Sequence, residues 1–160
     1  MKKEWAKPEY AKMKLVTTVY GDDQADKSYR ETQGLLKAYP NLKGIIAPTS
    51  VGIVAAAKAV VDAGLVGKVF VTGLGLPSEM KGAVIAGATD TFAIWNPIDL
   101  GYTAVMIAAM IQSGKADGKP GSTIHAGRMG DIKIGDDGQA AMADPFTFDK
   151  TNIEQFSKIF

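Results

Sequence analysis

The sequence predicts an α/β fold in three αβα layers, with helices covering both faces of a mainly parallel sheet. Short apolar segments alternate with helical segments through the first 97 residues, and the connections between them are short. Strands that are apolar throughout are typical of a parallel sheet buried on both faces. Hydrophobic residues make up 46% of the 160-residue chain and charged residues 22%, which is typical of a globular protein.

The first strand is predicted at Lys14–Tyr20, where β-branched residues dominate. Gly21 and two aspartates interrupt it. Residues 24–39 then carry apolar or aromatic side chains at helical spacing, which predicts an amphipathic helix. Pro40 ends this helix, because proline cannot continue the backbone hydrogen bonding.

Two further strands are each followed by a predicted helix. Residues 42–48 indicate a short buried strand, and residues 51–63 an almost wholly apolar helix with a C-capping glycine behind it. Residues 68–72 predict the third strand, and residues 78–86 the next helix. Crossovers between parallel strands of this kind are right-handed.

The last part of the chain follows a different pattern. The fourth strand, 91–94, runs into a polar and aromatic corner at 95–97. A helix at 98–113 is apolar nearly all round, so we expect it to be buried on more than one side. After a polar linker, short antiparallel strands and one last helix are predicted at residues 124–127, 130–135, 146–148 and 152–158.

A ligand site is predicted where the parallel strands end, because ligands bind outside the carboxyl ends of the strands in open α/β sheets. The strongest candidates are Trp95 and Asn96, since a flat aromatic and an amide can hold a polyol. The alternative is that Trp95 covers the end of the sheet and Asn96 begins a turn, and the residues alone leave both open. Four loops fall at this edge: 19–21, 48–50, 74–76 and 95–97.

The loop Gly73–Ser78 approaches the glycine-rich pattern of a dinucleotide site, since it follows a strand and opens a helix. Pro77, however, lacks an N–H that a phosphate would need, and Ser78 stands where the third glycine belongs. We therefore expect these glycines to keep the loop tight and expect no nucleotide cofactor.

No catalytic or metal-binding set is predicted. The chain has no cysteine, and His125 is the only histidine. The adjacent carboxylates at 22–23 and 136–137 lie in glycine-rich loops, where aspartates are commonly turn residues. We expect no enzyme, no metal and no cofactor.

The formal charge of +1 argues against a nucleic-acid partner. The basic start Met1–Lys3 is not followed by an apolar region, so we expect no signal peptide in this chain. The longest apolar run, Tyr102–Ile111, is about half the length of a membrane span. We expect a soluble protein without one.

Four runs in series resemble one family. They resemble the carboxyl-terminal part of the type I, or ribose-type, periplasmic sugar-binding proteins of ABC transporters, and most of all the rhamnose-binding and autoinducer-2-binding branch. The runs are Gly-Ile-Ile-Ala-Pro at 44–48, Val-Thr-Gly-Leu-Gly-Leu-Pro at 71–77, Phe-Ala-Ile-Trp-Asn-Pro at 92–97 and Phe-Asp-Lys-Thr-Asn-Ile at 148–153.

The resemblance implies a periplasmic-binding-protein-like fold whose two lobes close on a sugar, with the contacts made by strand-end loops. Ribose-type relatives place an Asp where this chain has Gly75, which favours a deoxy sugar or a smaller ligand. The ligand-binding residues that the resemblance implies are Pro48, Thr49, Ser50, Leu74, Gly75, Trp95 and Asn96.

Members of the family are about twice as long, so the resemblance implies that the amino-terminal lobe is missing. Residues 1–97 would be a partial carboxyl-terminal lobe, 98–122 would belong to the other lobe, and 123–160 would return to the first. The sheet would also lack its central strand. Exposed strand edges favour association, so we expect a homodimer that fills the gap by exchange or by joining sheet edges.

The resemblance thus implies the periplasmic sugar-binding component of an ABC importer, working with a permease. It would bind a monosaccharide such as rhamnose, weakly or not at all as an isolated half. The alternative is a self-associating fragment with no ligand of its own. A third possibility, the effector-binding core of a repressor, needs a DNA-binding head for which the amino terminus has no room.

Overall fold

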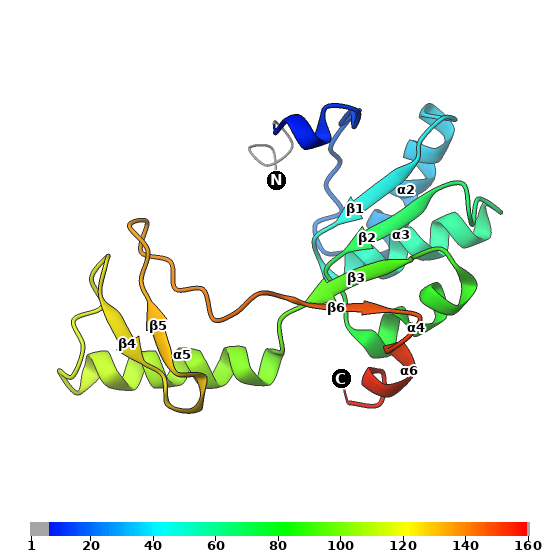
Figure 1. The fold of residues 1–160 in the computed structure, drawn as a ribbon. Coiled ribbons are helices and arrows are strands. Elements are labelled where there is room, and N and C mark those ends of the chain that lie inside the picture. The colour runs from blue at the N-terminus through cyan, green and yellow to red at the C-terminus, as the bar shows by residue number, and fades with distance from the viewer. Residues whose placement is uncertain (1–6, 160) are drawn as a thin grey trace.

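The computed structural model describes residues 7–159, which form a helix-backed sheet and a projecting arm (Figure 1). Among these residues, no helix combines the length and apolar character needed to cross a membrane. The elements in chain order are η1 (Pro8–Tyr10), α2 (Ala25–Ala38), β1 (Gly44–Ala47), α3 (Ser50–Asp62), β2 (Phe70–Gly73), α4 (Pro77–Ala86), β3 (Thr91–Ile94), α5 (Pro97–Gln112), β4 (Thr123–His125), η2 (Gly127–Met129), β5 (Asp131–Lys133), β6 (Phe146–Asp149) and α6 (Ile153–Phe156).

The sheet is mainly parallel, as predicted. β1 pairs with β2 in parallel, with Ile45 opposite Val71. β3 follows on the other side of β2, since Val71 N donates to Ala88 O at 2.9 Å and Leu74 forms a parallel bridge with Ala93. β6 closes that edge as an antiparallel strand beside β3.

One face of the sheet carries the core. α3 packs against β1, β2 and both neighbouring helices, so α2, α3 and α4 form one helical layer. The buried cluster joins these helices to the inward side chains of the strands and to α6, with Ile53, Met80, Phe92 and Phe148 at its centre. Phe92 and Phe148 stack across the β3–β6 pair, with ring centroids 5.3 Å apart.

The opposite face of β1 and β2 is bare among the described residues. Ile46 and Phe70 point away from the helical layer and remain 40% and 39% exposed. The αβα arrangement is therefore incomplete: one helical layer covers the sheet where a buried parallel sheet needs two.

The predicted first strand at Lys14–Tyr20 is wrong for this structure. Residues 14–20 are extended but belong to no strand, and no backbone hydrogen bond joins them to β1. The β-branched composition gives the segment a preference for extended backbone, but a strand also needs a neighbour to pair with. No strand lies beside the outer edge of β1 in the described part of the chain.

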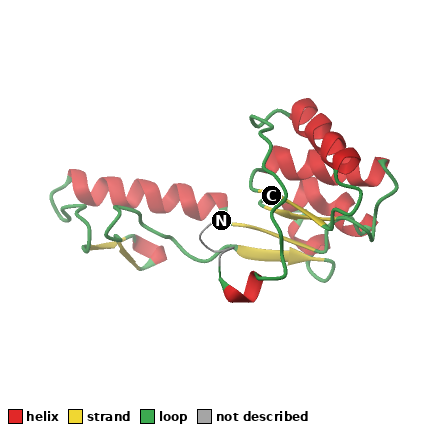
Figure 2. Cartoon of the chain, turned by 90° about the horizontal axis from the view of Figure 1, so that it is seen from above, coloured by secondary structure: helices red, strands yellow, loops and turns green. Residues whose placement is uncertain are grey.

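The arm consists of α5 with the antiparallel hairpin β4–β5 and the turn η2 (Figures 1 and 2). β4 and η2 pack against α5, and the chain returns to the sheet only with β6 and α6. Residues 123–160 were expected to return together to the lobe formed by residues 1–97. They are instead divided between the two parts, since β4 and β5 lie in the arm and β6 and α6 lie at the sheet. α5 was expected to be buried on several sides, but among its residues only Thr103 is buried.

Candidate functional site

The rim of the sheet brings three of the four predicted loops together. Ala47 O accepts from Leu74 N at 3.1 Å, and Ala93 O accepts from Gly75 N at 3.2 Å. These two bonds link the ends of β1, β2 and β3 side by side. The fourth loop, residues 19–21, ends no strand, because the segment before it is unpaired.

The loop after β1 provides a helix N-terminus at this rim. Thr49 is the N-cap of α3, and its Oγ1 accepts from Gly52 N at 3.0 Å. Pro48 and Thr49 are exposed and Ser50 is half-buried. The side chain of Thr49 is thus partly committed to the helix, whereas Ser50 Oγ makes no hydrogen bond within the described residues and is available to a ligand.

The loop after β2 is shaped by packing. A Cβ on Gly73 would lie 1.9 Å from Ala47 O, so only glycine allows β1 and β2 to come this close. Gly75 is buried, and a Cβ there would lie 2.8 Å from Met80 Cγ and 2.9 Å from Ile53 Cγ2. An aspartate in place of Gly75 would not fit, which is consistent with the departure from the family pattern.

The same loop is unsuited to phosphate. A glycine-rich phosphate site needs free backbone N–H groups. Here the amides of Leu74 and Gly75 already donate to neighbouring strands, and Pro77 has no N–H. The expectation that these glycines keep the loop tight agrees with the geometry.

The corner after β3 carries the aromatic and the amide. Trp95 is 36% exposed, and its indole Nε1 donates to Ala143 O at 2.7 Å, which holds the returning chain against the corner. Asn96 is the N-cap of α5, where its Oδ1 accepts from Ile98 N at 3.0 Å. The indole face of Trp95 and the Nδ2 of Asn96 are the parts left for a ligand. Of the two roles considered from the sequence, the structure shows the capping role, since Asn96 begins α5.

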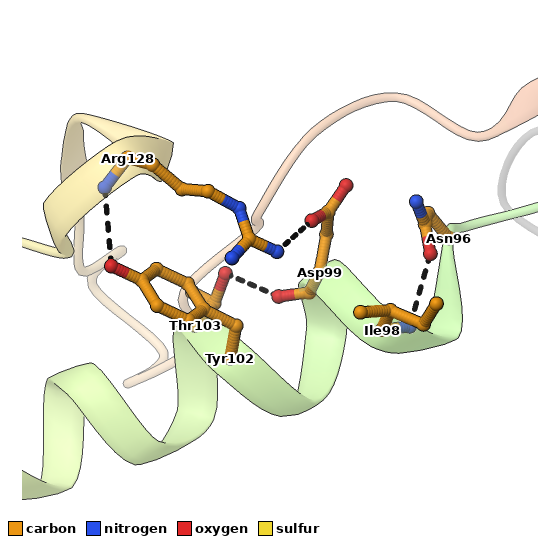
Figure 3. A network of polar contacts seen from close by, with 6 residues as sticks. All are labelled: Asn96, Ile98, Asp99, Tyr102, Thr103 and Arg128. Carbon is orange, nitrogen blue, oxygen red and sulfur yellow. Dashed lines mark hydrogen bonds and ion pairs between the residues drawn. The ribbon is translucent and has the colours of Figure 1, made fainter.

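Next to this corner lies a polar network that the sequence did not reveal (Figure 3). The Arg128 guanidinium pairs with the carboxylate of Asp99 and lies 4.0 Å from the centroid of the Tyr102 ring. Tyr102 Oη also accepts from Arg128 N at 3.3 Å, and Thr103 Oγ1 donates to Asp99 O at 2.7 Å. The network fixes η2 of the arm onto the first turns of α5.

The spacing of Asp99 and Tyr102 is the one sequence signal that could have pointed to part of this network. Residues three apart lie on one face of a helix. Arg128 comes from a glycine-rich segment 29 residues after Asp99, where no periodic pattern marks it. Figure 3 shows Asn96 on the same first turns of α5 as Asp99.

The remaining candidates serve as turn or surface residues. Asp22 and Asp23 have φ of 51° and 55°, and Asp22 pairs with Lys27. Asp137 Oδ1 accepts from Gln139 N at 3.1 Å, as an aspartate in a turn does. The exposed His125 Nδ1 lies 2.8 Å from Asp131 Oδ1 on the β4–β5 hairpin. In residues 7–159, no group of three His, Cys, Asp or Glu side chains could hold a metal ion.

A cavity of about 320 Å³ lies away from this rim, by the start of β3 and the end of β6. None of the predicted ligand residues lines it. There the Thr151 hydroxyl and amide hold the pKa of Asp149 below its usual value, because both donate to the carboxylate. Asp149 thus acts as the turn residue between β6 and α6.

Residues 1–116 match the model of the periplasmic binding protein domain. The chain is similar to the crystal structure of a sugar ABC transporter protein from Actinomyces odontolyticus, with 41% identity and a TM-score of 0.79 over 98% of this chain and 50% of that one.

A second solved structure is an ABC transporter solute-binding protein from Clostridium phytofermentans with bound L-rhamnose. It shares 36% identity and a TM-score of 0.90 over 100% of this chain and 54% of that one. LsrB from Clostridium saccharobutylicum, in complex with AI-2, shares the fold at 20% identity and a TM-score of 0.80, with 96% of this chain and 52% of that one covered. The chain thus spans about half the length of the proteins that it matches, and it belongs to the periplasmic binding protein family.

Proposed function

We propose that the chain is the carboxyl-terminal half of the sugar-binding component of an ABC importer. The observation that carries this proposal is the rim, where backbone hydrogen bonds hold the loops with Ser50, Trp95 and Asn96 side by side. An aromatic face and free polar groups at one sheet edge suit a monosaccharide. The L-rhamnose in a relative that is 36% identical over the whole of this chain supports rhamnose as the ligand class.

In this proposal the rim is one wall of a binding site. The family is periplasmic, so the natural location would be the periplasm and the partner a permease. The arm from residue 98 would pack in the second lobe, and the sugar would be held between the lobes. Closure around a ligand provides much of the affinity in such proteins. The isolated chain should therefore bind sugar weakly.

The test is a titration of the isotope-labelled chain with L-rhamnose, followed by backbone amide shifts in NMR spectra. We expect weak, millimolar binding, detectable at about 100 mM sugar, with shifts confined to the loops at 48–50, 74–75 and 95–96. Trp95→Ala should remove the shifts, whereas Asn41→Ala, on an exposed loop, should leave them unchanged. Shifts elsewhere, or none at the rim, would contradict the proposed site. Micromolar affinity would contradict the half-site.

A second candidate is a self-associating fragment with no ligand of its own, and its natural form would be a homodimer. The unpaired edge of β1 and the exposed apolar side chains of α5 favour it. It predicts a dimer in solution whose melting temperature does not change with sugar. Light scattering on the chain and thermal melts with L-rhamnose distinguish the two candidates, because the first predicts a sugar response and the second does not.

A further inference from the structure

The segment Leu15–Tyr20 has the composition of a strand but no partner. Its apolar side chains are exposed, and Tyr20 reaches 74%. Within the described residues, none of the amides or carbonyls of residues 15–20 takes part in a backbone hydrogen bond. An extended β-branched segment with unpaired backbone groups is able to add to the edge of a sheet.

The outer edge of β1 is the matching acceptor. β1 pairs on one side with β2, and its other side faces no strand among the described residues. Ile46 and Phe70 leave an apolar surface beside this edge. α2 packs against α3 and so extends the helical layer past β1. A strand added at this edge would lie over that layer, and its groups would be paired and partly buried.

Charge decides the direction of the added strand. Lys12 and Lys14 stand at the beginning of the segment, and Asp22 and Asp23 follow it. Lys43 stands at the beginning of β1. A parallel strand would bring lysines toward Lys43, whereas an antiparallel strand brings the aspartates there. Opposite charges across a strand pair stabilise it and like charges destabilise it.

We propose that residues 15–20 of one copy pair antiparallel with the free edge of β1 in a second copy, and that the contact is reciprocal about a twofold axis. The register that places Asp22 and Asp23 by Lys43 sets Tyr20 opposite Gly44. This inference rests on the self-association proposed above and names its surface. Because each copy is both donor and acceptor, the assembly closes as a dimer.

The register also gives each side chain a suitable place. Directly opposite residues lie on the same face of a sheet. Val19 falls opposite Ile45, toward the helical layer. Tyr20 falls opposite Gly44, whose other neighbour is Phe70. Since Gly44 has no side chain, the Tyr20 ring can lie across it and cover the bare face beside Phe70.

The first test is the mass of the chain in solution, measured by size-exclusion chromatography with light scattering. We expect a dimer for the unaltered chain and a monomer for Thr18→Pro, which removes the backbone N–H that faces Ile46 in the proposed register and stiffens the added strand. Residue 18 makes no backbone bond within a copy, so the monomer fold tolerates the change. Ala141→Pro, in another exposed extended segment, should remain a dimer. A monomeric unaltered chain would overturn the proposal.

The second test determines the direction of the added strand by disulfide cross-linking. The chain has no cysteine of its own, so only the introduced cysteines can react. A Gly44→Cys copy carrying a size tag is mixed with an untagged Tyr20→Cys copy and oxidised. We expect a tagged–untagged disulfide dimer on a non-reducing gel. The matched control mixes Gly44→Cys with Val16→Cys, which lies opposite Pro48 in the proposed register and comes to Gly44 only if the direction or the register of the strands is different. Cross-linking through residue 16, or a dimer with neither cross-link, would overturn the proposed strand pairing. The sugar titration tests the ligand site at the rim independently of this result.

Discussion

α3 and α5 are similar sequences in different surroundings. Both are long, rich in Ala, Val and Ile, and capped by a polar side chain at the sheet rim. α3 buries six of its residues against the strands and two helices, whereas α5 buries Thr103 alone. Figure 2 shows α5 running away from the sheet, with the hairpin on one side.

The difference shows that an apolar helix is buried only where neighbours exist to cover it. On α5, the side chains of Ile98, Leu100, Val105 and Ile111 remain exposed. Ile98 and Val105 lie on one side of the helix and Leu100 and Ile111 on the other, so apolar side chains are exposed nearly all round it. The helix-backed sheet is a folded core, whereas the apolar side chains of α5 have no such cover among the described residues.

The largest expected effect tests this contrast with one substitution at two sites. Ile53→Ala, at a side chain with 0% exposure, should lower the free energy of unfolding by about 2–5 kcal/mol. Ile98→Ala, at a side chain with 65% exposure, should change it by less than about 0.5 kcal/mol. Urea denaturation measures both. Equal losses would mean that α5 is buried in solution.

A glycine pair tests the packing of the rim. Gly75→Ala would place a methyl group against Met80 and Ile53, and we expect a loss of about 1–3 kcal/mol in stability. Gly82→Ala, on α4 with nothing within 4 Å, should stabilise the chain by up to about 1 kcal/mol because alanine favours helix. Thermal melts of the two variants should therefore shift in opposite directions. A stable Gly75→Ala variant would mean that the loop is looser than the contacts indicate.

The attachment of η2 to α5 should depend on the planar guanidinium of Arg128. Arg128→Lys keeps the charge but loses most of the stacking on Tyr102, a contact of about 0.5–1 kcal/mol at an exposed site. We expect the Ala126 and Met129 amides, which are bonded within this turn, to exchange about two- to fivefold faster. Arg30→Lys on α2 is the control. Unchanged exchange would show that the hairpin holds the turn alone.

The smallest effect is a pH dependence at the link between α4 and α6. The hydrogen bond from Lys81 holds the pKa of Glu154 below its usual value. A lowered folded-state pKa gives stability that is present above the ordinary glutamate pKa and is lost as the pH falls through the lowered one. Lys81→Met should therefore flatten the acid side of the stability curve. Urea midpoints measured from neutral to acidic pH check this, and an unchanged slope would contradict it.

The local order of the sheet could be predicted from the sequence. The strand at Thr91–Ile94 was placed to the residue, and the other helices and strands of the sheet region lie within a few residues of their predicted bounds. These segments carry short-range signals, such as the Thr49 cap, Pro77 at a helix start and Gly87 with φ of 80° at a helix end. The rim followed from the general position of ligand loops in parallel sheets.

Two features depended on contacts between distant residues. Lys14–Tyr20 has strand composition, but pairing is a property of two segments and its partner is absent from the described chain. Arg128 reaches Asp99 only because the hairpin folds back on α5. No local pattern encodes either relation.

By itself the sequence determined the alternation of strand and helix, the caps, and the three loops that meet at Trp95 and Asn96. The tertiary structure alone decided which apolar surfaces are covered. The physical reason is that periodicity and capping act over a few residues, whereas burial and strand pairing require a second surface. α3 has that surface in β1 and β2, while α5 and the edge of β1 still lack it.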